Sequence, residues 1–476
     1  MTQKWADELA MHIPDRDIAA LYAQLAERLT FEQLPAEVID ATRKLILDQL
    51  GVMLVGSAAS GVGELMRAAR SFGGTAEASV LVHGDRLPAH HAALINGTMA
   101  QAHDFDAFHE SAMVHVTAGC LPQCLAIAER HGGVSGKEFL AAMALGMELM
   151  LRLGLSFETN FLHTGRVTTL HLATFGGALA AARLMRLSPK ATVSALGLAC
   201  AQVAGNLQVT VEGTVLVRVL QGLAAQSSVL SAVFAEQGLQ GPERVFQGEF
   251  GYFRAYHDNR YTPEILTRGL GSEWHTPGVS IKFYPCCFLA HFAIDAMRRM
   301  VDAGEVVADE IEAIHVRVTQ GTYNVVCAPI EAKRAPATTQ EALFSLPYTI
   351  ANAAVHGGLE VAHMTADAVG DARVRALAQK VSTVVDADLE RDYGRVIGPS
   401  IVEVALKSGR TAALRVDAVK GSPLDPMSFA DCETKFWSCA PFAARELKRS
   451  RLEQAVNAVR NLEKLDDVTQ LVRLLT

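Results

Sequence analysis

Long apolar segments with few charges dominate the first half of this chain and limit what it can fold into. Small residues such as Gly176 and Gly177 recur in them, which lets neighbouring helices pack closely. A helix that is apolar on all sides has to be buried. These segments cover Ala89–Ala102, Lys137–Leu153, Leu170–Met185, Pro189–Val203 and Leu216–Gln237. Together with an apolar periodicity that begins at Asp17, they predict that residues 16–275 are almost wholly helical.

The sequence pattern changes near residue 276. Ile311–Thr322 alternates between apolar and polar residues, and Lys380–Asp388 carries a β-branched run, so both predict strands. Ser400–Val419 predicts a hairpin that turns at residues 408–410. Glu341–Val355 predicts a helix between these strands, and helical sequence returns from Ser428 to the end.

We therefore predict a mainly α protein with two domains. A large helical domain would comprise residues 16–275 and 420–476. An α+β domain of residues 276–419, roughly 140 residues long and of ordinary domain size, would be inserted into it as a lid. A cleft between two such domains is a natural place for a ligand.

Composition narrows the class of partner. The chain is 50% hydrophobic and 20% charged, so it can bury a sizeable core, and its net charge is −8. That charge argues against a nucleic-acid surface and suits a protein that binds small molecules. The eight cysteines have no metal-finger spacing and are expected to be reduced and mostly buried. Met1–Asp15 is not a signal peptide, and no stretch approaches the roughly 20 apolar residues of a membrane span, so we expect a cytoplasmic enzyme without a membrane partner.

A polar island at residues 103–115 interrupts the apolar helices. It contains His103, Asp104, Asp106, His109 and His115. Desolvating such groups is costly unless they are paired, and an active site is one reason to do so. A new helix is expected to begin directly after His115, and its dipole would favour a neutral imidazole that can act as a general base. The alternative is a polar loop whose Asp residues cap helices.

A second polar group lies in Ser280–His291. Lys282 can bind a carboxylate or act as an acid or base, and Tyr284 is two residues away. The adjacent Cys286 and Cys287 are more often packing residues than redox groups.

Two further groups suit anion binding. Within Phe161–His171, Arg166 and Thr169 come directly before or at the start of a buried helix, where an anion binds well, although ordinary capping by Thr is the alternative. Arg218 lies near the start of a long apolar helix and would bind an anion or form a buried ion pair with Glu212.

Cofactor motifs are missing from the sequence. His103, Asp106, His109 and His115 are metal-ligand types, but their spacing matches no standard metal motif. The chain has no Gly-rich phosphate loop and no nucleophile elbow. Metal binding is therefore the less favoured interpretation of these His and Asp residues.

In these motifs and their order the chain resembles the MmgE/PrpD family over nearly its whole length. That family includes dehydratases, decarboxylases and epimerases of small carboxylic acids. The resemblance implies a helical domain with an α+β lid, a homodimer and chemistry without a cofactor. The matching segments are Leu47–Gly51, Asn96–Gly97, His103–Asp106, His115 before Gly119, Thr174–Gly176, Glu212–Thr214, Gly222 with Ala224–Gln226, Lys282–His291, Phe344–Tyr348, Lys420–Pro423 and Lys435–Phe436.

The resemblance also implies a set of site residues. The family's catalytic positions carry over to three residues, Asp104, His115 and Lys282. The residue patterns themselves, not the family, supply the candidates for substrate binding, which are Asp106, His109, Arg166, Thr169, Arg218 and Tyr284.

Two positions depart from the family pattern, because Val167 and Val217 stand where the family has His and Lys. A pocket with these valines is more apolar and favours a less charged or bulkier substrate.

The expected reaction is proton transfer next to a carboxylate or carbonyl, as in a cofactor-independent dehydratase or decarboxylase. His115 would be the general base or acid, Asp104 its partner or a second acid–base group, and Lys282 the binder of a carboxylate or oxyanion. The alternatives are an epimerase or isomerase on a related substrate, and a ligand-binding protein that has lost catalysis.

Overall fold

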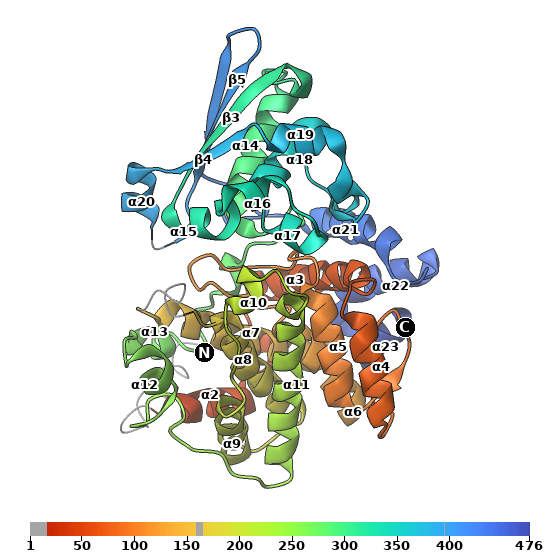
Figure 1. Cartoon of the computed structure of the whole chain (residues 1–476). Coiled ribbons are helices and arrows are strands. Elements are labelled where there is room, and N and C mark those ends of the chain that lie inside the picture. The colour runs from red at the N-terminus through yellow and green to blue at the C-terminus, as the bar shows by residue number, and fades with distance from the viewer. Residues whose placement is uncertain (1–16, 159–164, 395) are drawn as a thin grey trace. The chain divides into compact units, whose positions relative to one another are not determined.

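The computed structural model describes residues 17–158, 165–394 and 396–476, which form two compact units (Figure 1). The helical unit comprises the described residues up to Ala102, Asp106–Val279 and Ser428–Thr476. The sheet unit comprises Ser280–Met427 together with the short segment His103–Phe105. Both main boundaries fall a few residues later in the chain than the sequence predicts.

The helical unit contains the helices that the apolar segments predict, which confirms a mainly α protein. Helices α5 and α11 approach so closely that a Cβ on Gly97 would lie 2.8 Å from the Cα atom of Gly222. This contact requires glycine on both helices. The helices are α2 (Ile18–Arg28), α3 (Ala36–Gly56), α4 (Val62–Phe72), α5 (Ala89–Gln101), α6 (Leu121–His131), α7 (Gly136–Ser156), α8 (Thr168–Leu184), α9 (Pro189–Cys200), α10 (Gln208–Val211), α11 (Leu216–Glu236), α12 (Tyr252–His257), α13 (Pro263–Thr267), α21 (Phe429–Cys439), α22 (Arg449–Arg460) and α23 (Thr469–Leu474).

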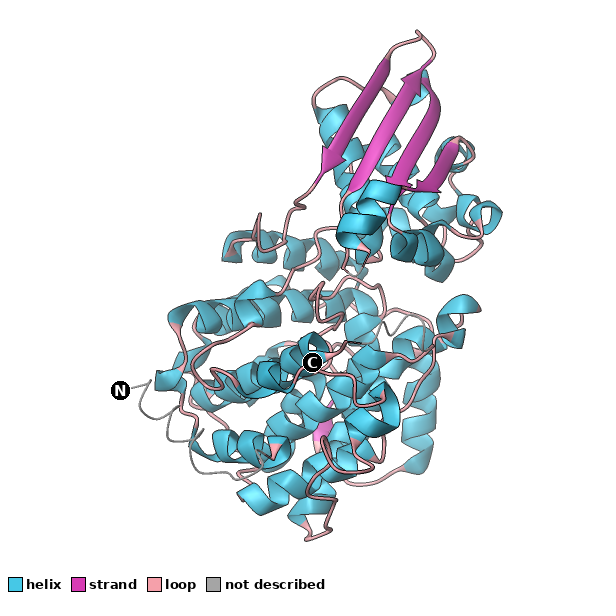
Figure 2. Cartoon of the chain, turned by 90° about the vertical axis from the view of Figure 1, so that its left-hand side faces the viewer, coloured by secondary structure: helices cyan, strands magenta, loops and turns pink. Residues whose placement is uncertain are grey.

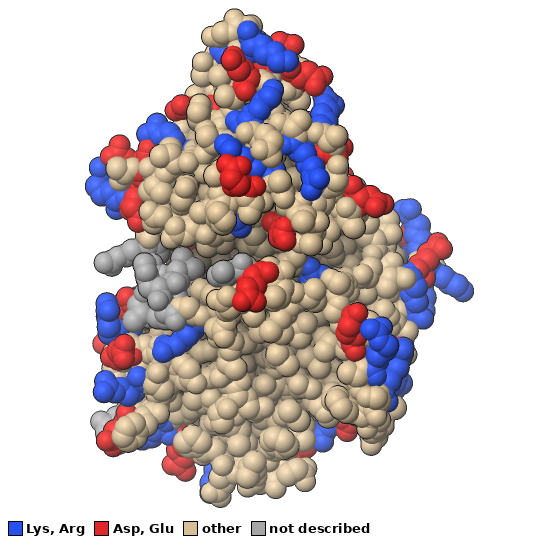
Figure 3. Space-filling model, in the orientation of Figure 1, with Lys and Arg blue, Asp and Glu red and all other residues tan. Residues whose placement is uncertain are grey.

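Helices α7 and α11 are long and apolar enough to cross a membrane by length and composition, which the sequence analysis did not expect. The apolar stretch of α7 is 94% buried, so α7 is a core helix of this unit. The corresponding stretch of α11 is only 56% buried. Leu216, Leu223 and Phe234 are exposed on it, and Figure 3 shows few charged side chains over the face that carries α11.

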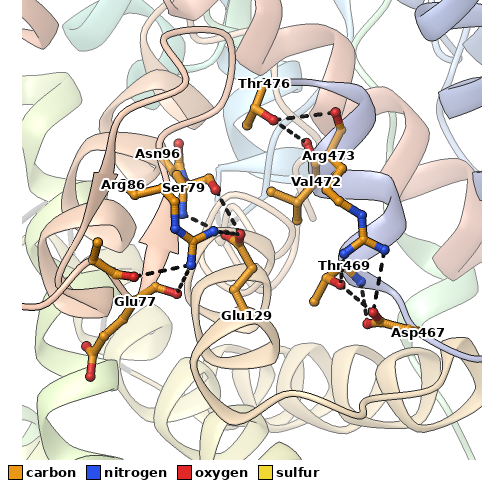
Figure 4. Close-up of polar contacts among 11 residues, drawn as sticks. Glu77, Ser79, Arg86, Asn96, Glu129, Asp467, Thr469, Val472, Arg473 and Thr476 are labelled. Carbon is orange, nitrogen blue, oxygen red and sulfur yellow. Dashed lines mark hydrogen bonds and ion pairs between the residues drawn. The ribbon is translucent and has the colours of Figure 1, made fainter.

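A short ribbon of β1 (Ala78–Ser79) and β2 (Arg86–Leu87) also belongs to this unit. Glu129 on α6 accepts hydrogen bonds from the backbone and side chain of Ser79, and Asn96 on α5 donates to the carbonyl of Ser79 (Figure 4). The sequence predicts helix throughout this part of the chain and misses the ribbon, because two-residue strands leave no alternating pattern.

A buried ion pair attaches the last part of the chain to the first. The ammonium of Lys435 on α21 lies 2.6 Å from the carboxylate of Asp48 on α3, and both side chains are almost fully buried. Beside it, a Cβ on Gly51 would lie 2.9 Å from the Cα atom of Phe436, so α3 and α21 are in close contact.

A buried cluster of aromatic rings contains two histidines that share one hydroxyl. The ring nitrogens of His171 and His257 lie 3.2 Å and 3.3 Å from the hydroxyl of the fully buried Tyr252. The ring of Phe157 stacks on the ring of His257, with 3.9 Å between the two ring centroids. Burial lowers the pKa of both histidines to about 4, because the charged imidazolium loses its hydration.

The sheet unit is built on four strands in the order β4-β3-β5-β6 (Figure 2). The strands are β3 (Ile311–Val318), β4 (Val381–Val385), β5 (Ser400–Leu406) and β6 (Thr411–Val416). Strand β4 runs parallel to β3 and the other pairs are antiparallel, so the predicted hairpin is confirmed. The helices are α14 (His291–Asp302), α15 (Gln320–Thr322), α16 (Ile330–Arg334), α17 (Thr339–Leu343), α18 (Leu346–His356), α19 (Ala372–Ala378) and α20 (Ala387–Tyr393).

Two predicted elements of this unit have different bounds. Strand β3 ends at Val318 because Thr319 caps the short α15. The helix expected at 341–355 is divided into α17 and α18 because the side chain of Ser345 accepts the backbone N–H of Tyr348 and starts a new helix. Pro347 in the first turn of α18 fits this start.

Removing one partner of the buried ion pair should be costly. Lys435→Met takes the cation away from a fully buried carboxylate, so we expect the free energy of unfolding to fall by about 3–5 kcal/mol in urea denaturation. In the matched control Asp48→Leu/Lys435→Met, both charges are gone and most of the stability should return. A loss of about 1 kcal/mol or less in the single variant would mean that the pair behaves like a surface salt bridge.

The buried histidines should make the helical unit sensitive to acid. Their pKa of about 4 is below the usual value of 6.5, so the unfolded chain binds more protons between these two values. The stabilisation is therefore complete above pH 6.5 and is lost as the pH falls towards 4. We expect the urea midpoint to fall over this range and to fall less in His257→Gln. If the urea midpoint of His257→Gln fell as much with pH as that of the unmodified protein, His257 would not be a source of the acid sensitivity.

Candidate active site

An imidazole–carboxylate pair lies in the loop that follows α5. The Nδ1 atom of His115 is 2.8 Å from Oδ2 of Asp106, which is fully buried. A carboxylate on Nδ1 keeps the proton there and leaves Nε2 as the basic nitrogen. The ring of Phe108 lies 4.8 Å away, and the hydroxyl of Thr169 accepts the backbone N–H of His115 at 3.1 Å. Asp106, Phe108 and Thr169 thus fix the position of this imidazole.

The local backbone explains why this loop is not helical. His109 and Val114 form an isolated antiparallel bridge, and a further turn places the N–H of Gly119 on the carbonyl of His115. Helix α6 begins only at Leu121. The prediction that a helix begins directly after His115 is therefore wrong, and the nearby carboxylate of Asp106, not a helix dipole, selects its tautomer.

A second pair lies in the sheet unit. The ammonium of Lys282 donates to Oδ1 of Asp104 at 2.8 Å and to the backbone carbonyl of the same residue at 2.7 Å. Lys282 is almost fully buried, and its segment is held by a hydrogen bond from Ile281 N–H to the carbonyl of Gly421. Asp104 has φ +47°, a left-handed conformation that Asp tolerates better than most residues.

The pairing differs from the one that the sequence favours. The sequence predicts Asp104 as the partner of His115 or as a second acid–base group, and it predicts Asp106 as a substrate contact. In the structure Asp106 is the partner of His115, while Asp104 is the partner of Lys282.

The two arginines predicted to bind substrate make other contacts. Arg166 donates to the carbonyl of Tyr256 and lies over its ring. Arg218 donates to the side chain and carbonyl of Ser60, whereas Glu212 accepts a hydrogen bond from Gln208. Residues 161–164 of the motif around Arg166 lie outside the described residues.

Tyr284 also has a network of its own. Its hydroxyl donates to Asp295 at 2.8 Å and accepts from Arg298 at 3.0 Å. Burial, with the carboxylate of Asp295 beside it, raises the pKa of Tyr284 above its usual value. Asp295 and Arg298 both belong to α14, so these contacts hold the ring of Tyr284 against that helix of the sheet unit.

His109 is a neutral imidazole in the same loop as His115. Its Nδ1 atom accepts the N–H of Ala112 at 3.0 Å. Burial lowers the pKa of His109 to about 4, and the neighbouring His275 adds to this effect.

The vicinal cysteines have the properties of packing residues. All eight cysteines of the chain are free thiols. Cys286 and Cys287 are buried, and burial raises the pKa of Cys287 to about 12, so it is a poor nucleophile. This agrees with the packing interpretation of the sequence.

Asp104, Asp106 and His115 are residue types that can ligate a metal. In the structure, Oδ1 of Asp104 accepts a hydrogen bond from Lys282, and Oδ2 of Asp106 lies on Nδ1 of His115.

Three further residues of the helical unit are absent from the sequence prediction. Glu148 and Arg152 are a fully buried pair on α7, and His275 lies on the same carboxylate. The available signal was the occurrence of two opposite charges four residues apart in an otherwise apolar helix.

Comparisons with known proteins identify the family of this chain. The model of the MmgE/PrpD N-terminal domain matches residues 21–264, and that of the C-terminal domain matches residues 284–461. The chain is 27% identical to the cis-aconitate decarboxylase-like protein oryM of Aspergillus oryzae, over 97% of this chain and 98% of that protein. It is 26% identical to a cis-aconitate decarboxylase of Aspergillus terreus, over 100% and 98% of the two chains. It is 27% identical to the human cis-aconitate decarboxylase, over 97% and 95%. The chain therefore belongs to the MmgE/PrpD family.

Proposed function

We propose that this protein is a lyase that removes CO2 from a small unsaturated carboxylic acid without a metal or organic cofactor. The observation that carries the proposal is the pair of His115 and Asp106, which presents a basic Nε2 on a fixed imidazole. The names of the relatives, which match the chain over nearly its whole length, support decarboxylation as the reaction.

The proposed reaction needs a group that accepts the electron pair of the broken bond and an acid that protonates carbon. When the bond to CO2 breaks, its electron pair stays with the substrate and is delocalised over the conjugated double bond and carboxylate. His115 then delivers a proton from Nε2 to carbon, and solvent restores it. Asp106 holds the ring in place and compensates the charge of the imidazolium before the transfer.

Lys282 is the proposed binder of the substrate carboxylate. Its two hydrogen bonds to Asp104 hold the ammonium in one place, which avoids the entropy cost of ordering a long side chain on binding. Only Phe105 separates Asp104 from Asp106 in the sequence, so their Cα atoms are at most about 7 Å apart in any conformation. Asp104, which holds the proposed binding group Lys282, is therefore connected through two peptide bonds to Asp106, which holds the proposed acid His115.

The charges also suggest the substrate class. Asp104 balances the charge of Lys282, and Val167 and Val217 add none. A tricarboxylate would bring three negative charges to a site with little positive charge. We therefore propose that acids with one or two carboxylates are better substrates than a tricarboxylate.

The reaction is tested with unsaturated acids that carry one, two or three carboxylates, including cis-aconitate, incubated in D2O and followed by NMR. We expect release of CO2 and one deuterium on carbon in the product, with the same rate in the presence of EDTA. Exchange of deuterium without CO2 would favour an epimerase or isomerase. Binding without either change would favour a ligand-binding protein, and inhibition by EDTA would contradict the absence of a metal.

His115→Gln should lower kcat by at least about 10²-fold, because an amide cannot deliver the proton. The matched control is His83→Gln, which changes a half-buried histidine of the helical unit whose Nε2 lies on the carbonyl of Ser57. Initial rates and circular dichroism are measured on both. Turnover near that of the unmodified protein in His115→Gln would remove His115 from the mechanism.

A further inference from the structure

A second carboxylate–imidazole pair lies in the helical unit. The Nδ1 atom of His275 is 2.8 Å from Oε1 of Glu148, and the backbone N–H of His275 donates to Oε2 at 2.8 Å. The carboxylate is almost fully buried, whereas the imidazole is 32% exposed. The Nδ1 proton therefore points to Glu148, and the basic Nε2 is left for another contact.

Arg152 fixes this carboxylate and the chain that leads to His275. Its Nε atom lies 2.7 Å from Oε1 of Glu148. Its two terminal nitrogens donate to four backbone carbonyls, which belong to Ile265, Arg268, Gly269 and Glu273. The buried charge of Glu148 is thus balanced by Arg152, and the imidazole is not needed for that purpose.

His275 lies beside the loop that carries His115. It is close enough to His109 to help lower the pKa of that imidazole. A Cβ on Gly278 would lie 3.4 Å from Nε2 of His109, so the segment after His275 continues along the same loop. Among the residues that the structure describes, Glu148 and His109 interact with His275, and Arg152 pairs with the same carboxylate of Glu148.

We propose that His275 is a further catalytic residue, whose Nε2 contacts the bound acid as a second proton-transfer group beside His115. This inference rests on the proposed function. The donor is the doubly protonated form of His275, whose Nδ1 proton stays on Glu148. As the electron pair of the broken bond moves onto the remaining carboxylate, this imidazolium gives its Nε2 proton to that oxygen and becomes neutral. When His115 protonates carbon, the electron pair forms the new C–H bond, and the oxygen returns its proton to His275.

The first test needs no turnover. The imidazole signals of His275 and His115 are followed by 15N NMR in the full chain while cis-aconitate, and separately maleate, is added. The signals are assigned by their loss in His275→Gln and His115→Gln, with the corresponding Asn variants as substitutes if either protein does not fold. We expect both signals to shift with the same ligand dependence. A shift of His115 alone overturns the inference but leaves the proposed function intact, and no shift of either contradicts both.

The second test uses kinetics on the best substrate of the acid panel. We expect His275→Gln to lower kcat by about 10²-fold, with KM changed much less, and to remove one ionisation from the pH profile of kcat. Added imidazole should restore part of the rate in His275→Gly, which a purely structural role does not predict. The control is again His83→Gln. An unchanged kcat and pH profile in His275→Gln, with His115→Gln inactive, overturns the inference alone.

Discussion

Burying an ionised side chain in an apolar helical protein requires a partner for it, and this constraint organises the structure. The core helices of the helical unit offer almost no water to solvate a charge. The buried ionic groups described above accordingly occur as matched pairs: Asp48 with Lys435, Glu148 with Arg152, and Asp104 with Lys282. Such pairs add little net stability, but losing one member leaves a charge that the core cannot solvate. Asp48 with Lys435 therefore joins α3 to α21, and Asp104 with Lys282 joins two distant segments of the sheet unit, whereas Glu148 and Arg152 lie on one helix.

The same constraint shapes the chemistry of the candidate site. A carboxylate that is already paired cannot serve freely as a base, so Asp104 and Asp106 are better described as groups that hold Lys282 and His115. Proton transfer is then left to imidazoles, which alone among these groups change charge near neutral pH.

The sequence predicts the fold better than it predicts the site, for a physical reason. Helical periodicity and strand alternation are local signals, so α11 and the hairpin of β5 and β6 are found within a few residues of their true ends. The division between α17 and α18 depends on one capping hydroxyl, that of Ser345, which competes with a favourable helical pattern.

Pairings across a loop have no such periodicity. Asp104 and Asp106 are equivalent in the sequence, and only the turns of the loop decide which of them lies on His115. Glu148 and His275 are 127 residues apart, so no spacing rule connects them. The spacing of Glu148 and Arg152 on α7 indicates an ion pair between them, but it does not indicate that His275 contacts the same carboxylate.

The way in which Arg152 holds residues 265–273 has a consequence for how this protein can vary. The guanidinium contacts four backbone carbonyls in this segment and none of its side chains. Every amino acid supplies a carbonyl, so a change of side chain does not by itself remove these four hydrogen bonds. Leu266 is buried, and Gly269 and Gly271 have positive φ, so these positions are constrained for other reasons. Arg268 and Glu273 are exposed, and they are the places in this segment where the side chain can be varied without moving His275.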